Sequence, residues 1–339
     1  MKKSTVALIV GCFLLLALLL FGYYNVTRPR VLVLYSYGSE LAWTQGLDKA
    51  VRDGLQALHR PILTRRHYMN LRDDTSEQYA ETAAASARRA IQDFQPHVLV
   101  VFDDQAAELT TPELLNDPDV KIVFAGIDDT LAHHGFDKAN NATGMLERLP
   151  AAALRDAVRH LGKRKPLTVA CIGHERMLET DEAADLAGVD WTPDTLLPCE
   201  PIGSFEDWKA AVKRLEGEAD ILLVTGYRGL PRSADDDDIA PPAEVAAWTD
   251  DNSRMLTLAA KSTFVSDGGA LAIAPSPNEH GHAAAQLVGR LLDGAAPRNI
   301  PVSTGKAFVV SINRERLKKR GFEMPPVYEA AARAGGSLQ

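Results

Sequence analysis

The sequence has few cysteines and no excess of positive charge. Of its 339 residues three are cysteines, and only Cys171 and Cys199 lie outside an apolar N-terminal run. A disulfide framework is thereby excluded, while the redox compartment and the bonding state of these two residues stay open. The formal net charge of −8 argues against a protein that follows nucleic-acid phosphates, since such binding needs a basic face. We expect no nucleic acid among its partners.

The sequence also lacks the motifs of common enzymes and cofactor sites. No Gly-x-Gly-x-x-Gly follows an expected strand, no Gly-x-Ser-x-Gly is present, and His174-Glu175 has no second histidine three residues later. We therefore expect neither a cofactor nor an enzymatic activity. Paired carboxylates are the acid–base groups that remain for catalysis.

Three polar segments invite a metal or a pH-sensing interpretation, and we favour a plainer one for each. His280 and His282 lie beside one another without a second cluster of ligands, so a solvated helix start is expected. Residues 235–238 are all aspartate but lack the oxygen spacing of a calcium loop, so they indicate a charged surface loop. His133 and His134 are expected in an exposed loop. We predict no metal site.

The N-terminal run is the clearest local signal. Two lysines precede an uncharged stretch from residue 6 to residue 24, and Arg28 follows it. At about 1.5 Å rise per residue, a helix of this length just crosses a hydrocarbon core of about 30 Å. A cleaved signal peptide has a shorter apolar region of about 7–15 residues and then a small-residue site, whereas Tyr23 and Tyr24 occupy that place and suit a membrane interface. We favour an uncleaved anchor, with a cleaved signal or a lipoprotein modified at Cys12 as alternatives. All three place the rest of the chain in the periplasm or outside the cell.

Beyond residue 30, short apolar runs alternate with helical patterns. This alternation predicts βαβ units and parallel sheets, an α/β fold. The first series of units is expected to run βαβαβαβ, with strands at residues 31–35, 62–68, 98–102 and 122–125. After a pause at residues 140–150 a second series follows. Its expected strands are residues 167–172, 195–198 and 221–225. Its expected helices include one opened by Ser204 and one at 245–248. A last helix is expected at 280–292 and an extended segment at 308–312.

Several phrases in this order resemble one protein family. They are Val-Leu-Val-Leu-Tyr-Ser-Tyr-Gly at 31–38, Ile-Val-Phe-Ala-Gly-Ile-Asp-Asp at 122–129, Ala-Thr-Gly-Met-Leu-Glu-Arg at 142–148, Ser-Phe-Glu-Asp-Trp at 204–208 and Asp-Gly-Gly-Ala at 267–270. The sequence from about residue 30 to 320 is similar to the ABC-transporter substrate-binding family that includes tryptophan-binding-like proteins. The resemblance implies a type I periplasmic binding protein fold, with two Rossmann-like lobes that close over a small solute. The membrane-spanning N-terminal helix departs from most members, which are released or lipid-anchored.

The expected organisation has three parts. Residues 1–29 form the signal anchor, residues 30–148 with about 276–298 form the first lobe, and residues 149–275 with about 299–330 form the second. No low-complexity linker separates the lobes, so several chain crossings are expected between them.

The carboxyl ends of the strands are the expected ligand site, because loops there face the crevice of an open α/β sheet. The candidate ligand-binding residues are Ser36, Tyr37, Trp43, Asp103, Asp104 and Asp128 in the first lobe, and His174, Tyr227, Arg228 and Lys261 in the second. Acidic groups fall on one lip, with Asp129 beside them, and basic groups on the other. This division suits a zwitterion such as an amino acid.

Each of these residues also has a structural interpretation. An aspartate at the start of a helix often caps exposed N–H groups without any ligand. Tyr37, Trp43 and Tyr227 are suited to stacking on a ring of the solute, while Trp43 fits core packing equally well.

Three functions remain from these observations. The leading one is a solute-binding protein of an ABC importer, with a small-molecule solute and an ABC permease as partners. The second is a membrane-tethered sensor that signals to a kinase or receptor. The third is an extracytoplasmic hydrolase that uses the aspartates at 103, 104, 128 and 129.

Overall fold

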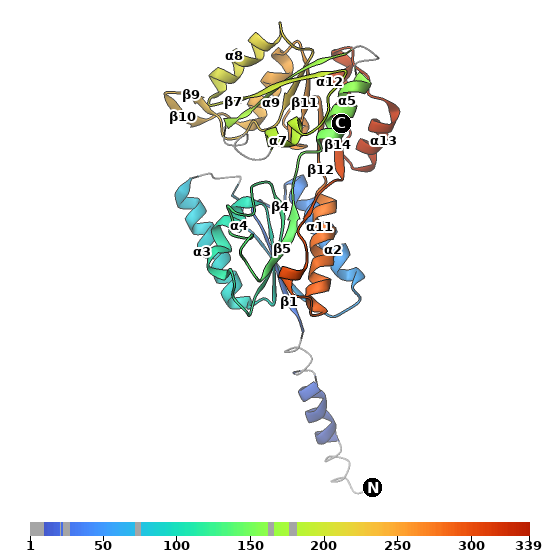
Figure 1. Ribbon diagram of the computed structural model, residues 1–339. Coiled ribbons are helices and arrows are strands. Elements are labelled where there is room, and N and C mark those ends of the chain that lie inside the picture. Colours follow the sequence, from blue (N-terminus) through green and yellow to red (C-terminus); the bar gives the residue numbers. More distant parts are fainter. Residues whose placement is uncertain (1–9, 21, 23–27, 72–75, 162–165, 176–181) are drawn as a thin grey trace.

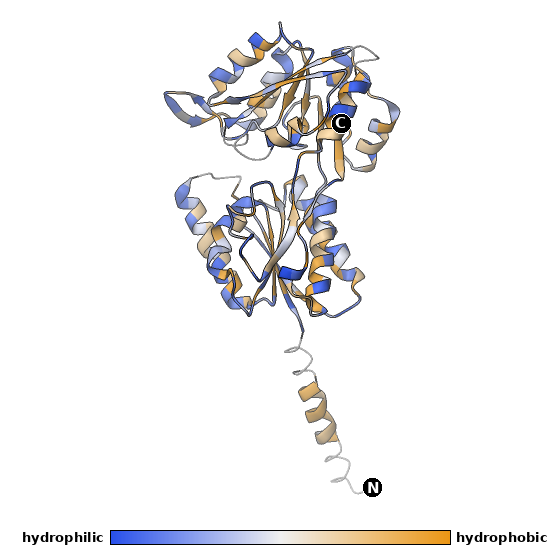
Figure 2. Ribbon diagram, viewed as in Figure 1, coloured by the Kyte–Doolittle hydropathy of each residue, from blue (hydrophilic) through white to orange (hydrophobic). Residues whose placement is uncertain are grey.

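The computed structural model describes residues 10–20, 22, 28–71, 76–161, 166–175 and 182–339. Residues 30 onward form two α/β lobes, one above the other in Figure 1. Residues 10–20 are helical with exposed side chains and are apolar throughout (Figure 2). In the described part of the chain, no helix combines the length and apolar character that a membrane crossing requires. The expected anchor at 6–24 lies partly outside the described residues and stays a prediction.

The first lobe is a parallel sheet with helices on both faces. Its strand order is β13-β5-β4-β3-β1-β2, and every pairing in it is parallel. Its elements are β1 (Arg30–Tyr35), α2 (Ala42–Ala57), β2 (Leu63–Tyr68), α3 (Glu77–Phe94), β3 (Val98–Phe102), α4 (Asp104–Thr110), the 3-10 turn η1 (Pro112–Leu114), β4 (Lys121–Ile127), β5 (Ala142–Leu146), α11 (Pro277–Leu292), the 3-10 turn η2 (Pro297–Asn299) and β13 (Ser303–Thr304).

Alternation along the strands produces two separate cores in this lobe. Val31 and Val33 pack toward α2 and α11, whereas Leu32 and Leu34 pack toward α3 and α4, because successive strand side chains point to opposite faces. α2 and α11 approach closely at Gly281, where an added Cβ would lie 2.6 Å from the Leu47 carbonyl oxygen.

The second lobe repeats this architecture. Its strand order is β14-β12-β11-β8-β6-β7, and β14 is antiparallel to β12. Its elements are α5 (Ala151–Leu161), β6 (Thr168–His174), α7 (Glu182–Ala187), β7 (Thr195–Ile202), α8 (Phe205–Leu215), β8 (Ile221–Val224), β9 (Pro231–Ser233), β10 (Asp236–Ile239), α9 (Pro242–Asn252), β11 (Leu256–Ala259), α10 (Thr263–Ser266), β12 (Leu271–Pro275), β14 (Phe308–Ile312), α12 (Arg314–Lys319) and α13 (Pro326–Ala334).

The chain crosses between the lobes at three places in the described residues. These are the segment between β5 and α5, Ser276 between β12 and α11, and residues 305–307 between β13 and β14. The return to the second lobe was expected at about residue 299 and comes later, because Ser303 and Thr304 still pair with β5. Multiple crossings fit lobes that move as bodies about a hinge.

Several local predictions were wrong or incomplete. The segment 140–150, where we expected a pause between the two series, contains the strand β5, which pairs with β4 in parallel. The loop expected at 235–238 is mostly β10, which pairs with β9 as an exposed antiparallel hairpin. The helix opened by Ser204 is confirmed, since the Ser204 hydroxyl accepts a hydrogen bond from the Asp207 N–H at 3.1 Å.

The structure also settles the cysteine pairing. Cys171 of β6 and Cys199 of β7 form a disulfide. They sit at facing positions of the two paired strands, so the bond fastens the edge strand β7 to its neighbour. Cys12 is a free, exposed thiol.

Candidate functional site

Asp103 sits at the turn between β3 and α4 and does not cap the helix. Its backbone has φ 70°, and its side chain makes no cap hydrogen bond. Instead, Oδ1 accepts a hydrogen bond from the Trp43 indole at 2.8 Å. Oδ2 has no hydrogen-bond partner among the described residues, although the residue is only 6% exposed. The capping interpretation is therefore wrong for Asp103.

Asp104 holds the loop that follows β4. Its carboxylate accepts hydrogen bonds from the backbone N–H groups of Asp128 at 3.0 Å and Asp129 at 3.2 Å. The ring Nε2 of His134 lies 2.8 Å from the same carboxylate. His134 was expected in an exposed loop, but its side chain is 1% exposed, because it packs against Phe136 beneath this carboxylate. Asp104 therefore positions Asp128.

Lys261 joins the two lobes through a group of carboxylates. Its ammonium lies 3.4 Å from Asp128 and 3.3 Å from Glu147, and 3.0 Å from Glu182 of α7. Asp128 belongs to the first lobe, Glu147 to the first crossing and Lys261 to the loop after β11. We name Asp103, Asp104, Asp128, Glu147 and Glu182 with Lys261 the interlobe cluster.

Burial and mutual repulsion shift the pKa values of this cluster. Burial, with the charges of Glu147 and Asp104, raises the pKa of Asp103 well above its usual range. Burial also raises the pKa of Asp128, with Asp104 and Glu147 adding to the effect. For Asp104, burial is outweighed by hydrogen bonds from His134 and Asp128, which lower the pKa. For Lys261, burial is outweighed by its carboxylate partners, which raise the pKa.

Tyr37 lies in the electrostatic field of the same cluster. Burial raises the pKa of its hydroxyl, and the charges of Asp103, Asp128 and Asp104 raise it further. The structure thus brings together six of the expected site residues. Tyr37, Trp43 and the aspartates 103, 104 and 128 come from the first lobe, and Lys261 comes from the second.

The other second-lobe candidates have contacts of their own. Arg228 makes an ion pair with Asp267, and the Tyr227 hydroxyl lies 2.6 Å from the same carboxylate. Tyr227 is buried against Phe264, so it packs in the core. His174 is buried as well, at the end of β6.

Ser36 has a structural role that the sequence does not reveal. Its hydroxyl donates to the Phe102 carbonyl oxygen at 3.1 Å and accepts from the Ala106 N–H at 2.8 Å. The side chain is fully buried. Ser36 therefore ties β1 to the start of α4 and supports the site indirectly.

Sequence reasoning missed three residues of this region. Glu147 and Glu182 do not follow a predicted strand directly, so the strand-end rule passed over them. His280 was expected on a solvated helix start but is 0% exposed, because its Nδ1 accepts from the Gly126 N–H and its ring lies 5.9 Å from the Trp43 ring. The spacing of His280 from Ser276, the N-cap of α11, was the signal in the sequence that could have placed His280 inside this helix.

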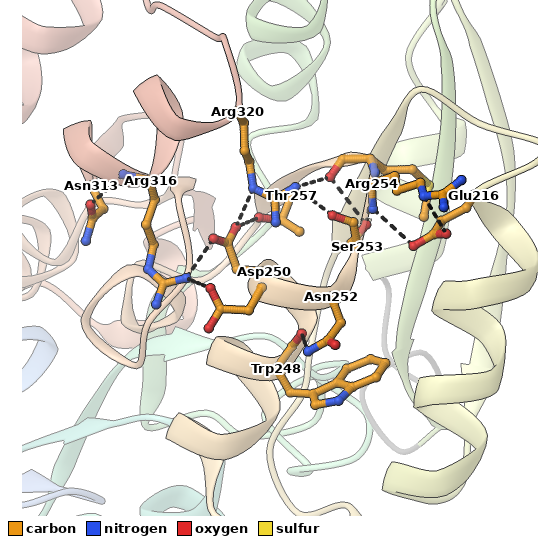
Figure 3. Close-up of polar contacts among 12 residues, drawn as sticks. Glu216, Trp248, Asp250, Asn252, Ser253, Arg254, Thr257, Asn313, Arg316 and Arg320 are labelled. Atoms are coloured by element: carbon orange, nitrogen blue, oxygen red, sulfur yellow. Dashed lines mark hydrogen bonds and ion pairs between the residues drawn. The ribbon is translucent and has the colours of Figure 1, made fainter.

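A cavity of about 430 Å³ lies elsewhere on the second lobe. It adjoins Ser253, which precedes β11, and Asn313, which follows the antiparallel β14, so it is at the opposite edge of the sheet from Lys261. Figure 3 shows Asp250 between Arg316 and Arg320; Arg316 donates to Asp250 at 2.9 Å, and Thr257 also donates to it. This fully paired network fastens α12 to α9, and we assign it to stability. No group of three or more metal-ligating side chains occurs in the described ranges.

The arrangement of two hinged α/β lobes with a polar cluster between them is the type I periplasmic binding protein fold. The ligand-free, open structure of a substrate binding protein with adhesive properties from Clostridium difficile matches with a TM-score of 0.64 at 14% identity, covering 88% of this chain and 96% of that one. An ABC domain in complex with L-Trp from Streptococcus pneumoniae matches with a TM-score of 0.60 at 14% identity, covering 91% and 100%. The branched-chain amino acid transporter substrate binding protein from Streptococcus pneumoniae, in complex with isoleucine, has a TM-score of 0.54 at 10% identity, covering 79% and 85%.

The family comparison agrees with the fold. Residues 244–333 match the family model of the ABC transporter substrate binding protein, and the resemblance noted in the sequence is confirmed over that segment. No curated protein sequence matches the chain.

Proposed function

We propose that this protein is the extracytoplasmic solute-binding protein of an ABC importer, and that it binds a small polar, amino acid-like solute between its lobes. The observation that carries this proposal is the interlobe cluster, in which Lys261 of one lobe meets Asp128 of the other at 3.4 Å. A zwitterion that replaces this direct contact would place its ammonium toward Asp128 and Glu147 and its carboxylate toward Lys261. The family match and the fold support the same function.

The disulfide supports a location outside the cytoplasm. Disulfides persist in oxidising compartments and are rare in the cytosol, and Cys171–Cys199 is formed here. Together with the apolar residues 10–20, it favours a globular part held in the periplasm by an N-terminal membrane anchor.

Mass spectrometry of small molecules that copurify with the full-length chain tests the proposal. The solute found in this way should raise the melting temperature, because a ligand that binds only the folded state at 100 times its dissociation constant adds about 2.7 kcal/mol of stability. A chain that carries no small molecule, and whose melting is unchanged by amino acids at millimolar concentration, would contradict it.

The two alternative functions, a sensor and a hydrolase, can be distinguished from an importer subunit by other observations. A sensor should have a kinase or receptor encoded beside it, whereas an importer subunit should have a permease and an ATPase. A hydrolase draws support from the opposite pKa shifts of Asp103 and Asp104, which an acid–base pair needs. However, the Asp104 carboxylate is already bound to His134 and two backbone N–H groups, so we favour binding. Turnover of a copurifying solute would reverse that preference.

A further inference from the structure

The interlobe cluster holds more negative groups than a neutral zwitterion needs. Its carboxylates are those of Asp103, Asp104, Asp128, Glu147 and Glu182. Among the described residues the basic side chains beside them are Lys261, Arg148 and His134. Arg148 donates to the backbone oxygens of Asp128 at 2.9 Å and Glu147 at 2.6 Å, and His134 lies 2.8 Å from Asp104. One zwitterion adds one positive and one negative group, so it leaves this excess unchanged.

Two of these carboxylates also carry oxygens without a hydrogen-bond partner among the described residues. Asp103 Oδ2 and Glu182 Oε2 have no hydrogen-bond partner in the described part of the chain. The two residues are 6% and 3% exposed, and a buried polar oxygen without a partner is costly to retain. Trp43 fixes the other oxygen of Asp103, so the free oxygen is held in place without being satisfied.

We infer that the solute carries a net positive charge, as an amino acid with a basic side chain does, and that its second cationic group binds the free oxygen of Asp103. The inference rests on the proposed function and specifies its solute class. The α-ammonium binds Asp128 and the α-carboxylate binds Lys261 in place of the direct contact between these two residues, and the side-chain cation supplies the positive charge that the cluster lacks. The Trp43 indole, which donates to Asp103, has an aromatic ring of the kind that packs on the methylene groups of such a side chain.

Pairs of amino acids that differ in the side-chain charge measure what that charge contributes to binding. L-Norleucine is lysine without the ε-ammonium, and L-citrulline is a neutral isostere of arginine. Calorimetric titration of the full-length chain in detergent should show L-lysine or L-arginine binding roughly 10- to 100-fold more tightly than its neutral counterpart, the range of one charge-assisted hydrogen bond. Asp103→Asn should reduce that preference about tenfold or more while norleucine binding stays unchanged.

Two further variants complete the experiment. Asp103→Ser, a smaller neutral replacement, should reduce the same preference if Asp103→Asn folds poorly. Asp53→Asn removes an exposed carboxylate of α2 that pairs with exposed Lys49, so it should leave every affinity as in the parent chain. Equal affinity for lysine and norleucine, or a preference that survives both cluster variants, would overturn the inference while leaving the proposed function intact. Failure of all four amino acids to bind would overturn the inference, and the copurification and melting experiment above would then decide the proposed function separately.

Discussion

Asp128 contributes its backbone and its side chain to different parts of the interlobe cluster. The backbone N–H is held by Asp104 and the carbonyl oxygen by Arg148, whereas the side chain faces Lys261 at 3.4 Å. Because Asp128 lies after β4 and before no helix, the helix-cap interpretation does not apply to it. A truncated side chain therefore removes the carboxylate and leaves the loop attached.

Replacing Asp128 by Ala separates a binding role from a structural one. We expect the affinity for the solute to fall by roughly 1.5–3 kcal/mol, the contribution of a hydrogen bond to a charged group. Lys261 keeps Glu147 and Glu182 as partners, so the melting temperature of the ligand-free protein should change little. Unchanged affinity with a clearly lower melting temperature would show that Asp128 serves stability alone.

The raised pKa of Asp103 makes the stability of the folded protein depend on pH. Its pKa in the folded protein is well above the unfolded value, so folding favours the protonated form. The stability that this group contributes is fully present below the unfolded pKa, about 4, and is lost as the pH rises through the folded pKa. Asparagine resembles the protonated side chain and keeps the bond from Trp43.

Asp103→Asn should consequently stabilise the ligand-free protein at pH 8, by a few degrees in melting temperature. At pH 4 the two proteins should melt together, since the parent residue is then protonated. Scanning calorimetry at both pH values measures the difference. A variant that is less stable than the parent at pH 8 would show that the ionised carboxylate is well satisfied and that the cluster has no excess of negative charge.

At the scale of the element, β7 depends on its bond to β6. β7 is an edge strand, and many of its side chains are only partly buried. Cys171 and Cys199 are 28 residues apart in sequence, and closing a loop of this size stabilises a fold by about 2–4 kcal/mol in the chain-entropy model.

Reducing this disulfide should lower the melting temperature of the second lobe. The double variant Cys171→Ser with Cys199→Ser should melt at the same lower temperature and should no longer respond to dithiothreitol. A parent chain whose melting is indifferent to dithiothreitol, with mass spectrometry showing that both thiols are free, would contradict a stabilising role for the bond.

Most strands were predictable from the sequence, and β5 was not. β3 at Val98–Phe102 and β14 at Phe308–Ile312 occur at the residues predicted. β5 contains Thr143 and Gly144 in a five-residue strand, and its register is set by β4: a Cβ on Gly144 would lie 2.1 Å from the Phe124 carbonyl oxygen. Such a strand is specified by its neighbour in space, which one sequence does not show.

The candidate site was predictable to the extent that it follows strand ends. Tyr37, Asp103 and Asp128 were found by that rule, and so was Lys261 after β11. Glu147 lies in the first crossing and Glu182 on α7 of the second lobe. Both reach Lys261 through the packing of elements far apart in the sequence, which a single sequence does not show. The pairing of Arg228 with Asp267 likewise depends on the turn after α10, and one sequence does not show it.

At the scale of the whole molecule, the first question is how the lobes are held at the membrane. If residues 6–24 are retained as an anchor, the protein should sediment with membranes, resist alkaline carbonate extraction and keep its original N-terminus in mass spectrometry. A new N-terminus near residue 25 in the soluble periplasmic fraction would show cleavage. An acylated Cys12 at the N-terminus would instead show a lipoprotein.

The central claim is that one solute contacts both lobes at the interlobe cluster, and hydrogen exchange with and without the copurifying solute tests it most directly. Solute should slow exchange in the loops around Asp103 and Asp128 of the first lobe and around Lys261 of the second, because closure orders both sides together. Residues 250–253 and 313–320, which surround the cavity at the far edge of the second sheet, should exchange as before. Protection confined to one lobe, or centred on that cavity, would contradict the account.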